Sequence, residues 1–173
     1  MLLETIGMVL ILAATTMTGA YLCLRERYHV QDLQTLEQAV LGIQNQILYL
    51  SAPLPEVLEA VSYQINGEIG SVLQETAQHM QQRTEQTAEE IWESVWRKHL
   101  PCTFLTGRDY EALMQYGKTL GYLNKEQQKD NSRFLLEYLQ REQETLRRRL
   151  EKNGRLYYSM GFLGGLLVVV ILL

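Results

Sequence analysis

Proline and cysteine are both scarce in this chain of 173 residues, and each scarcity excludes a class of protein. The three prolines stand at positions 53, 55 and 101, so no proline interrupts a helix in the long stretches between them. The two cysteines, Cys23 and Cys102, are too few for a secreted disulfide framework, and their spacing matches no zinc or thiol-redox motif. No run alternates with the period of a strand, so we expect an all-α protein.

Lysine and arginine are absent from both ends of the chain. All 16 of them lie within residues 25–155, together with 19 of the 20 acidic residues. The ends are apolar instead, because residues 5–24 and 156–173 hold 28 apolar residues in 38 positions. This distribution excludes an ordinary soluble enzyme and a disordered chain, and two apolar segments are too few for a polytopic transporter.

Each apolar end is long enough to cross a bilayer as a helix. Residues 5–24 would rise about 30 Å and residues 156–173 about 27 Å, close to the hydrocarbon thickness. Glu4 and the lack of a basic residue before the first segment favour an uncleaved anchor over a signal peptide. We therefore predict three parts: an N-terminal transmembrane helix (1–24), a helical bundle (25–155) and a C-terminal transmembrane helix (156–173).

Small residues in both predicted spans have the spacing of membrane-helix packing motifs. These are Thr15 with Gly19 in the first span and Gly161 with Gly165 in the second. Such pairs let helix backbones approach closely. The pattern fits equally a contact between the two spans of one chain and a contact between chains of a homo-oligomer.

Basic residues near the spans predict the orientation of the chain. Eight lie within about 20 residues of a span on the central side, and none lies on the outer side. The central block is therefore expected to be cytoplasmic. The cluster at 147–149, 152 and 155 is interpreted as a topology determinant that also touches anionic lipid headgroups. Nucleic acid is not expected as a partner, because the block 25–155 carries a net charge of −3.

The central block has the pattern of an antiparallel bundle of about six helices. Apolar residues at 33, 36, 40, 43, 47 and 50 form one helical stripe, which Pro53 and Pro55 end before the next helix begins. Asn66 and Gly67 predict a turn after that second helix. Similar apolar stripes predict the remaining helices, with apolar residues at 69–80, 91–96 and 110–120. The last predicted helix is long: Asn124 caps it, it runs from about 125 to 155 into the second span, and its apolar residues lie at 134–150.

Two capping boxes and a glycine pair refine this prediction. Thr87 with Glu90, and Thr106 with Asp109, have the spacing of a box that opens a helix. Gly117 and Gly121 lie one turn apart, and the usual reason to retain glycine in a helix is a close helix crossing. In the last helix, Phe134 and Leu135 are both expected on the apolar face.

No pattern of catalytic or cofactor-binding residues is present. The three histidines, at 29, 79 and 99, include a single ExxH at Glu26–His29, whereas a di-iron bundle needs two such pairs and two further glutamates. We interpret all three histidines as surface residues. Without a Walker loop, a nucleophile elbow or a metal motif, we expect no catalytic residue, no cofactor and no metal, and hence no enzyme.

Several short segments, in the same order, resemble the stage III sporulation protein AB family. They are Gln46–Tyr49 followed by Ala52–Glu56, then Tyr110–Leu113, then Gly117–Gly121, then Gln128, and finally Met160–Leu167 near the C-terminus. The resemblance covers nearly the whole chain. It departs from the family pattern at Gln46, where the family usually has glutamate.

The resemblance implies a sporulation function in the mother-cell membrane around the forespore. It implies a soluble part like the cytoplasmic domain of type II secretion and type IV pilus platform proteins. Its partners would be a cytoplasmic assembly ATPase, ring-forming subunits and other subunits of a sporulation channel. The alternative, from the residues alone, is a two-span signalling or scaffolding protein.

Two turns of the bundle are the expected sites of partner binding. They are the turn around 51–55 and the turn around 121–124, which are predicted to lie farthest from the membrane. The residues expected there are Pro53, Pro55, Glu56, Lys125 and Glu126.

Overall fold

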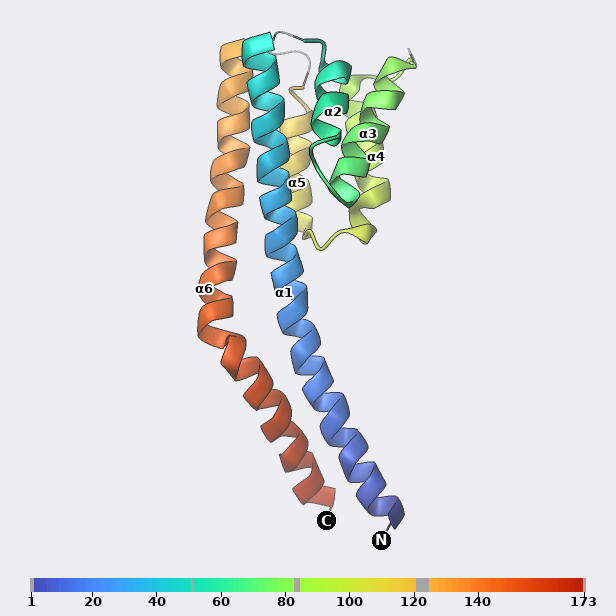
Figure 1. Ribbon diagram of the computed structural model, residues 1–173, viewed down its shortest axis with the longest axis vertical. Coiled ribbons are helices and arrows are strands. Elements are labelled where there is room, and N and C mark those ends of the chain that lie inside the picture. The colour runs from blue at the N-terminus through green and yellow to red at the C-terminus, as the bar shows by residue number, and fades with distance from the viewer. Residues whose placement is uncertain (1, 51, 83–84, 121–124, 173) are drawn as a thin grey trace. The chain divides into compact units, whose positions relative to one another are not determined.

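The computed structural model describes residues 2–50, 52–82, 85–120 and 125–172 of the chain (Figure 1). Within these ranges it is helical, without a strand. The helices are α1 (Leu2–Leu50), α2 (Leu54–Ser62), α3 (Glu68–Gln81), α4 (Ala88–His99), the short 3-10 helix η1 (Leu100–Cys102), α5 (Gly107–Gly117) and α6 (Lys125–Leu172). The prediction of an all-α fold with about six helices is confirmed.

The chain divides into two compact units. One consists of Gln31–Gln143 and is called the helical domain below; it holds α2 to α5 with the adjoining parts of α1 and α6. The other consists of Met1–Val30 and Glu144–Leu173. It holds the remaining parts of α1 and α6.

The two predicted transmembrane helices fall within α1 and α6. Among the residues that the structure describes, no helix has a stretch apolar and long enough to cross a membrane. Most side chains of 5–24 and all of those of 156–173 lie outside the described part, including those of Thr15, Gly19, Gly161 and Gly165. The two spans and their packing motifs therefore stay predictions.

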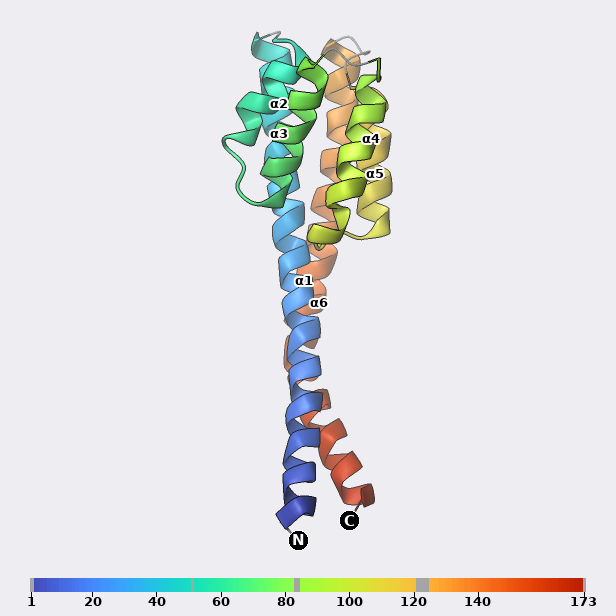
Figure 2. The same ribbon diagram turned by 90° about the vertical axis from the view of Figure 1, so that its right-hand side faces the viewer.

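The helical domain is a bundle in which each helix buries one face. In Figure 2, α2 and α3 lie on one side, α4 and α5 lie on the other, and α1 and α6 lie behind them. The core contains large side chains from all six helices. The largest fully buried ones are Trp96, Tyr116, Leu33, Leu36, Ile43, Leu58, Ile69, Leu73, Leu113, Leu120, Leu139 and Val57.

The ends of the short helices follow the local signals of the sequence. Both predicted capping boxes are present, with the Thr87 and Thr106 side chains each accepting from a backbone N–H and the N3 carboxylate accepting in return. The turn before α3 depends on Gly67, whose φ of 80° is a conformation that residues with a Cβ rarely adopt. Pro53 precedes α2, as predicted.

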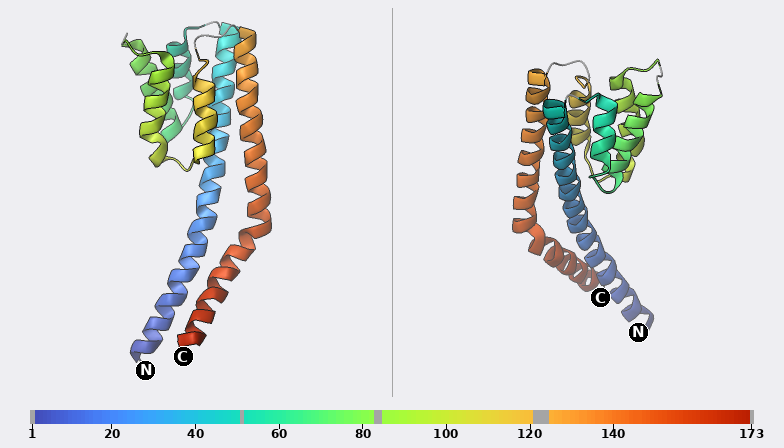
Figure 3. Two further views of the ribbon diagram at one scale, coloured as in Figure 1. Left: turned by 180° about the vertical axis from the view of Figure 1, so that it is seen from behind. Right: turned by 45° about the horizontal axis from the view of Figure 1, so that its top comes forward.

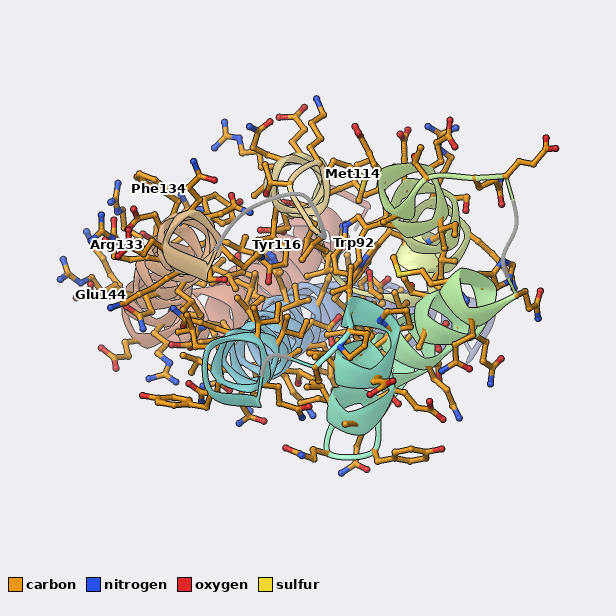
Figure 4. The ribbon with its side chains drawn as sticks, turned by 90° about the horizontal axis from the view of Figure 1, so that it is seen from above. Trp92, Met114, Tyr116, Arg133, Phe134 and Glu144 are labelled. Atoms are coloured by element: carbon orange, nitrogen blue, oxygen red, sulfur yellow. The ribbon has the colours of Figure 1, made fainter. Side chains whose placement is uncertain are left out.

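The face that α6 turns to the core differs from the predicted one at Phe134. This side chain is 64% exposed, whereas Leu135, Leu136 and Leu139 are buried. Figure 4 shows Phe134 on the outer side of its helix, beside Arg133, whose guanidinium lies 5.8 Å from the ring centroid. At about 100° per residue, Phe134 points about 160° away from Leu136 and about 140° away from Leu139, so the face that buries these two leucines leaves Phe134 on the opposite side.

The expected close helix crossing at Gly117 is confirmed, and it joins α5 to α4. A Cβ on Gly117 would lie 2.2 Å from Cδ1 of Trp92. The Trp92 indole donates a hydrogen bond of 3.0 Å to the Leu113 carbonyl oxygen and packs against Trp96 and Tyr116, with ring centroids 5.7 and 6.0 Å away. Figure 4 shows Trp92 and Tyr116 pointing toward each other. Gly121 lies outside the described residues.

Candidate docking surface

The first part of the predicted docking surface is the start of α2. Pro53 has extended backbone (φ −57°, ψ 144°), and its carbonyl oxygen accepts a hydrogen bond of 3.1 Å from the Val57 N–H. Pro53 and Glu56 are exposed and Pro55 is half-buried, while Val57 and Leu58 anchor the opposite face of the helix in the core. The negative charge of Glu56 also suits the positive end of the helix dipole.

The second part of the predicted surface is the start of α6. The helix begins at Lys125, whose side chain lies outside the described part of the chain, and Glu126 is exposed in its first turn. Gln128, one turn after Lys125, and Ser132, two turns after it, are buried. The Asn131 side-chain amide donates a hydrogen bond of 3.2 Å to the Tyr116 carbonyl oxygen on α5. This bond ties the start of α6 to the end of α5.

The structure brings both parts to one end of the helical domain. Figures 1 and 3 show the end of α1, the start of α2 and the start of α6 together there. We call this the Pro53 end. It places Pro53, Pro55 and Glu56 at the same end as Lys125 and Glu126; whether a partner binds them stays a prediction.

A third segment, which the sequence did not single out, also lies at the Pro53 end. It comprises the end of α3 and the start of α4 (Figure 1). The Gln81 side-chain amide donates a hydrogen bond of 2.8 Å to Glu59 Oε2 on α2, so the segment is tied to the predicted surface. Glu85 and Glu90 are exposed on it. No local sequence pattern predicts that the end of α3 lies beside α2, because Gln81 and Glu59 are 22 positions apart.

The opposite end of the domain contains the turns after α2 and α4, and we call it the Gly67 end. There the Phe104 N–H donates a hydrogen bond of 2.7 Å to Asp32 Oδ2 on α1. Asp109, buried at 1% exposure, accepts from the Thr106 N–H at 2.6 Å and from the Tyr138 hydroxyl at 2.8 Å. Burial first, and then the bond to Asp109, raise the pKa of Tyr138. These bonds serve the packing of α1, α5 and α6.

Two of the three histidines are not surface residues, contrary to the prediction. His29 is 6% exposed, and the side chain of His99 is 13% exposed. His99 lies between two glutamates of α3, with Nδ1 2.6 Å from Glu68 Oε1 and Nε2 2.8 Å from Glu75 Oε2. No local sequence pattern predicts this contact, because Glu68 and Glu75 lie 31 and 24 positions from His99.

Among the described residues, these groups do not form a metal site. In the ranges that the structure describes, no three His, Cys, Asp or Glu side chains are placed to hold a metal ion. At His99 the two ring nitrogens face different carboxylates on opposite edges of the ring, which is not an arrangement around one ion. The described part of the candidate docking surface consists of helix starts and exposed charged side chains.

Comparison with known proteins identifies the family. The family model described as stage III sporulation protein AB matches residues 4–173. The chain belongs to this family. It is 24% identical over 172 residues to the stage III sporulation protein AB of Bacillus subtilis (strain 168), covering 99% of this chain and all of the relative.

A solved structure is similar to this fold. The structure of stage III sporulation protein AB (SpoIIIAB) superposes with a TM-score of 0.66 at 19% sequence identity, over 71% of this chain and 96% of that one. At this level of identity the likeness concerns the fold. The resemblance noted from the sequence motifs is thus confirmed at the level of the family, and the chain is a sporulation protein with a helical fold.

Proposed function

We propose that this stage III sporulation protein AB relative is a non-enzymatic membrane platform in the mother-cell membrane around the forespore. It would dock a cytoplasmic assembly ATPase and ring-forming subunits of a channel between the two cells. The observation that carries the proposal is family membership over residues 4–173. The fold is consistent with the proposal, because the described residues form a helical bundle similar to that of the solved stage III sporulation protein AB structure.

The two-span topology is part of this proposal. It rests on the apolar ends, and on basic side chains that are exposed where the structure describes them. The exposed basic side chains are Arg25 and Arg27 on α1 and those of residues 147–149 and 152 on α6. All of them belong to the unit that contains both apolar ends. That unit nets +3 and the helical domain nets −7. Basic residues beside apolar segments favour the cytoplasmic side.

The Pro53 end is the proposed docking surface. Residues 31–50 of α1 rise about 30 Å within the helical domain, so this end stands clear of the end at which α1 enters the domain. The turn at Pro53 is already fixed by its proline and its backbone hydrogen bond, which lowers the conformational cost of binding. Its exposed Glu56 and Glu126, with Lys125, offer charges of both signs to a partner.

Capture of the ATPase from sporulating cells tests the proposal. The full chain in detergent would serve as bait, with the ATPase identified by mass spectrometry. We expect the Glu56→Lys/Lys125→Glu variant to retain much less ATPase than the wild type. The matched control reverses an exposed pair at the first turns of α5, Arg108→Glu/Glu111→Lys, and should capture as the wild type does.

Two results would count against the docking surface. One is equal capture by the wild type and by the variant with reversed charges at the Pro53 end. The other is an equal loss in the control variant, which would indicate a general effect of charge. Absence of any ATPase with wild-type bait would contradict the platform itself and favour a signalling or scaffolding protein.

A further inference from the structure

His99, the last residue of α4, is held between two carboxylates of α3. Glu68 and Glu75 are seven residues apart, which places them two turns apart on the same face of α3. The ring lies between them, with its Nδ1 at 2.6 Å from Glu68 Oε1 and its Nε2 at 2.8 Å from Glu75 Oε2. The side chains of Glu68, Glu75 and His99 are 36%, 24% and 13% exposed, so the contact is partly shielded from water.

This geometry specifies the protonation state of the ring. A neutral imidazole has one N–H donor and one acceptor nitrogen, whereas the imidazolium has two donors. Because a carboxylate oxygen faces each nitrogen, only the imidazolium donates to both. Partial burial opposes the charged ring, but the hydrogen bonds to Glu68 and then to Glu75 outweigh it and raise the pKa of His99. Hydrogen bonds from Lys98 and then from His99 lower the pKa of Glu75.

We propose that the Glu68–His99–Glu75 clamp is a pH-sensitive latch that holds the end of α4 on α3 while the ring is protonated and loosens when the ring becomes neutral. Deprotonation turns one ring nitrogen into an acceptor that faces a carboxylate, so one bond is lost and replaced by repulsion. The latch stands at the Gly67 end, where α4 passes into η1 and the chain continues to the Phe104–Asp32 bond on α1.

Other charged groups around the clamp determine which bond breaks. Lys98 Nζ lies 2.8 Å from Glu75 Oε1, and His79 Nε2 lies 3.8 Å from the same oxygen. Lys98 donates to both carboxylate oxygens of Glu75, so Glu75 retains a partner when the His99 ring becomes neutral. The contact most sensitive to deprotonation is therefore the one between His99 and Glu68. Because His79 is a second histidine in contact with Glu75, the experiments below include a His79 variant as a control.

The sign of the effect follows from the raised pKa of His99. A group whose pKa is higher in the folded state contributes stability that is fully present below its unfolded pKa of about 6.5. That contribution is lost as the pH rises through the folded value. The latch is thus closed in mildly acidic conditions and opens on the alkaline side of pH 6.5.

Histidine ring NMR on the full chain in detergent micelles tests the protonation. His99 is assigned by the signal that disappears in His99→Gln. We expect its ring to be doubly protonated at pH 6 and to titrate above 6.5. Glu68→Gln should lower the midpoint by about one unit, because one anionic partner is removed. A midpoint at or below 6.5 in the wild type, or a neutral ring at pH 6, would overturn the proposal without relying on any variant.

Unfolding by denaturant tests whether the contact between α4 and α3 weakens as the pH rises. The two tryptophans of the chain, Trp92 and Trp96, are buried on α4, so their emission reports the packing of the helix that the latch holds. We expect the wild type to lose stability between pH 6.5 and pH 8.5 and His99→Gln to lose clearly less. His79→Gln is the matched control and should follow the wild type. Identical pH profiles for the wild type and His99→Gln would also overturn the latch.

Discussion

Replacing Gly117 by alanine should destabilise the helical domain, although alanine is the better helix former. The new Cβ would lie 2.2, 2.5 and 2.8 Å from Cδ1, Nε1 and Cγ of the Trp92 indole. The indole has little freedom to move. It is 2% exposed, it packs against Trp96 and Tyr116, and its N–H donates to the Leu113 carbonyl oxygen at 3.0 Å.

The size of the effect follows from three contributions. Overpacking of a closed core costs about 1–3 kcal/mol. A displaced indole that loses its acceptor leaves a buried donor without a partner, at a cost of about 1–3 kcal/mol. The gain from helix propensity is at most about 1 kcal/mol, and smaller at the last residue of α5. We therefore expect Gly117→Ala to lower the free energy of unfolding by about 2–3 kcal/mol.

Denaturant unfolding of the full chain in detergent, followed by tryptophan emission, measures this loss. Gly107→Ala is a matched control, because Gly107 is the first residue of the same helix and a Cβ there meets no atom within 4 Å. In the double variant Gly117→Ala/Trp92→Phe, the smaller phenylalanine leaves room for the new Cβ. Its loss of stability should therefore be smaller than the sum of the losses of the two single variants. Wild-type stability of Gly117→Ala would refute the argument, as would strict additivity in the double variant.

Three further predictions concern the fold and the topology. Asp109→Ala removes the acceptor for both the Thr106 N–H and the Tyr138 hydroxyl, and should cost about 2–4 kcal/mol in the same unfolding assay; a loss below about 1 kcal/mol would contradict a structural role for this carboxylate. Cys102 is exposed on the helical domain, so a membrane-impermeant thiol reagent should label it in lysed cells but not in intact cells, and labelling of intact cells would refute the predicted orientation. A fragment of residues 25–155 should be soluble and more than half helical by circular dichroism, because the helical domain has its own core; the spectrum of a random chain would disprove this.

Features encoded by adjacent residues could be predicted from the sequence. The start of α2 at Pro53, the turn at Gly67 and the capping boxes at Thr87 and Thr106 each depend on fewer than five consecutive positions. Their physical cause is local, since each satisfies a free backbone group or supplies a backbone angle beside it in the chain. The close approach at Gly117 was predictable for the related reason that glycine in a helix needs a compensating contact.

Features that depend on polar contacts between distant residues could not be predicted. Buried Gln143 donates a hydrogen bond of 2.8 Å to Glu37, across 106 positions, so polar residues occupy part of the face that α6 buries. These polar residues weaken the apolar stripe of α6, so the sequence pattern assigns Phe134 to the buried face although its side chain is exposed. The clamp around His99 could not be predicted for the same reason. Glu68 and Glu75 are far from His99 in the sequence, and neither spacing belongs to a known motif.

For the docking surface, the sequence predicts the residues but not their function, because a structural role and a partner-binding role would both explain them. The Pro53 carbonyl oxygen closes the first turn of α2, and Glu56 complements the helix dipole, so both would be retained in a chain that bound nothing. A structural role and a partner-binding role of Glu56 predict different effects of a charge reversal, the first on stability and the second on ATPase capture. An exposed Glu56→Lys change at a helix start costs about 0.3–1 kcal/mol of stability, which leaves the fold intact. A large loss of ATPase capture by this variant would then exceed anything that its structural role can explain.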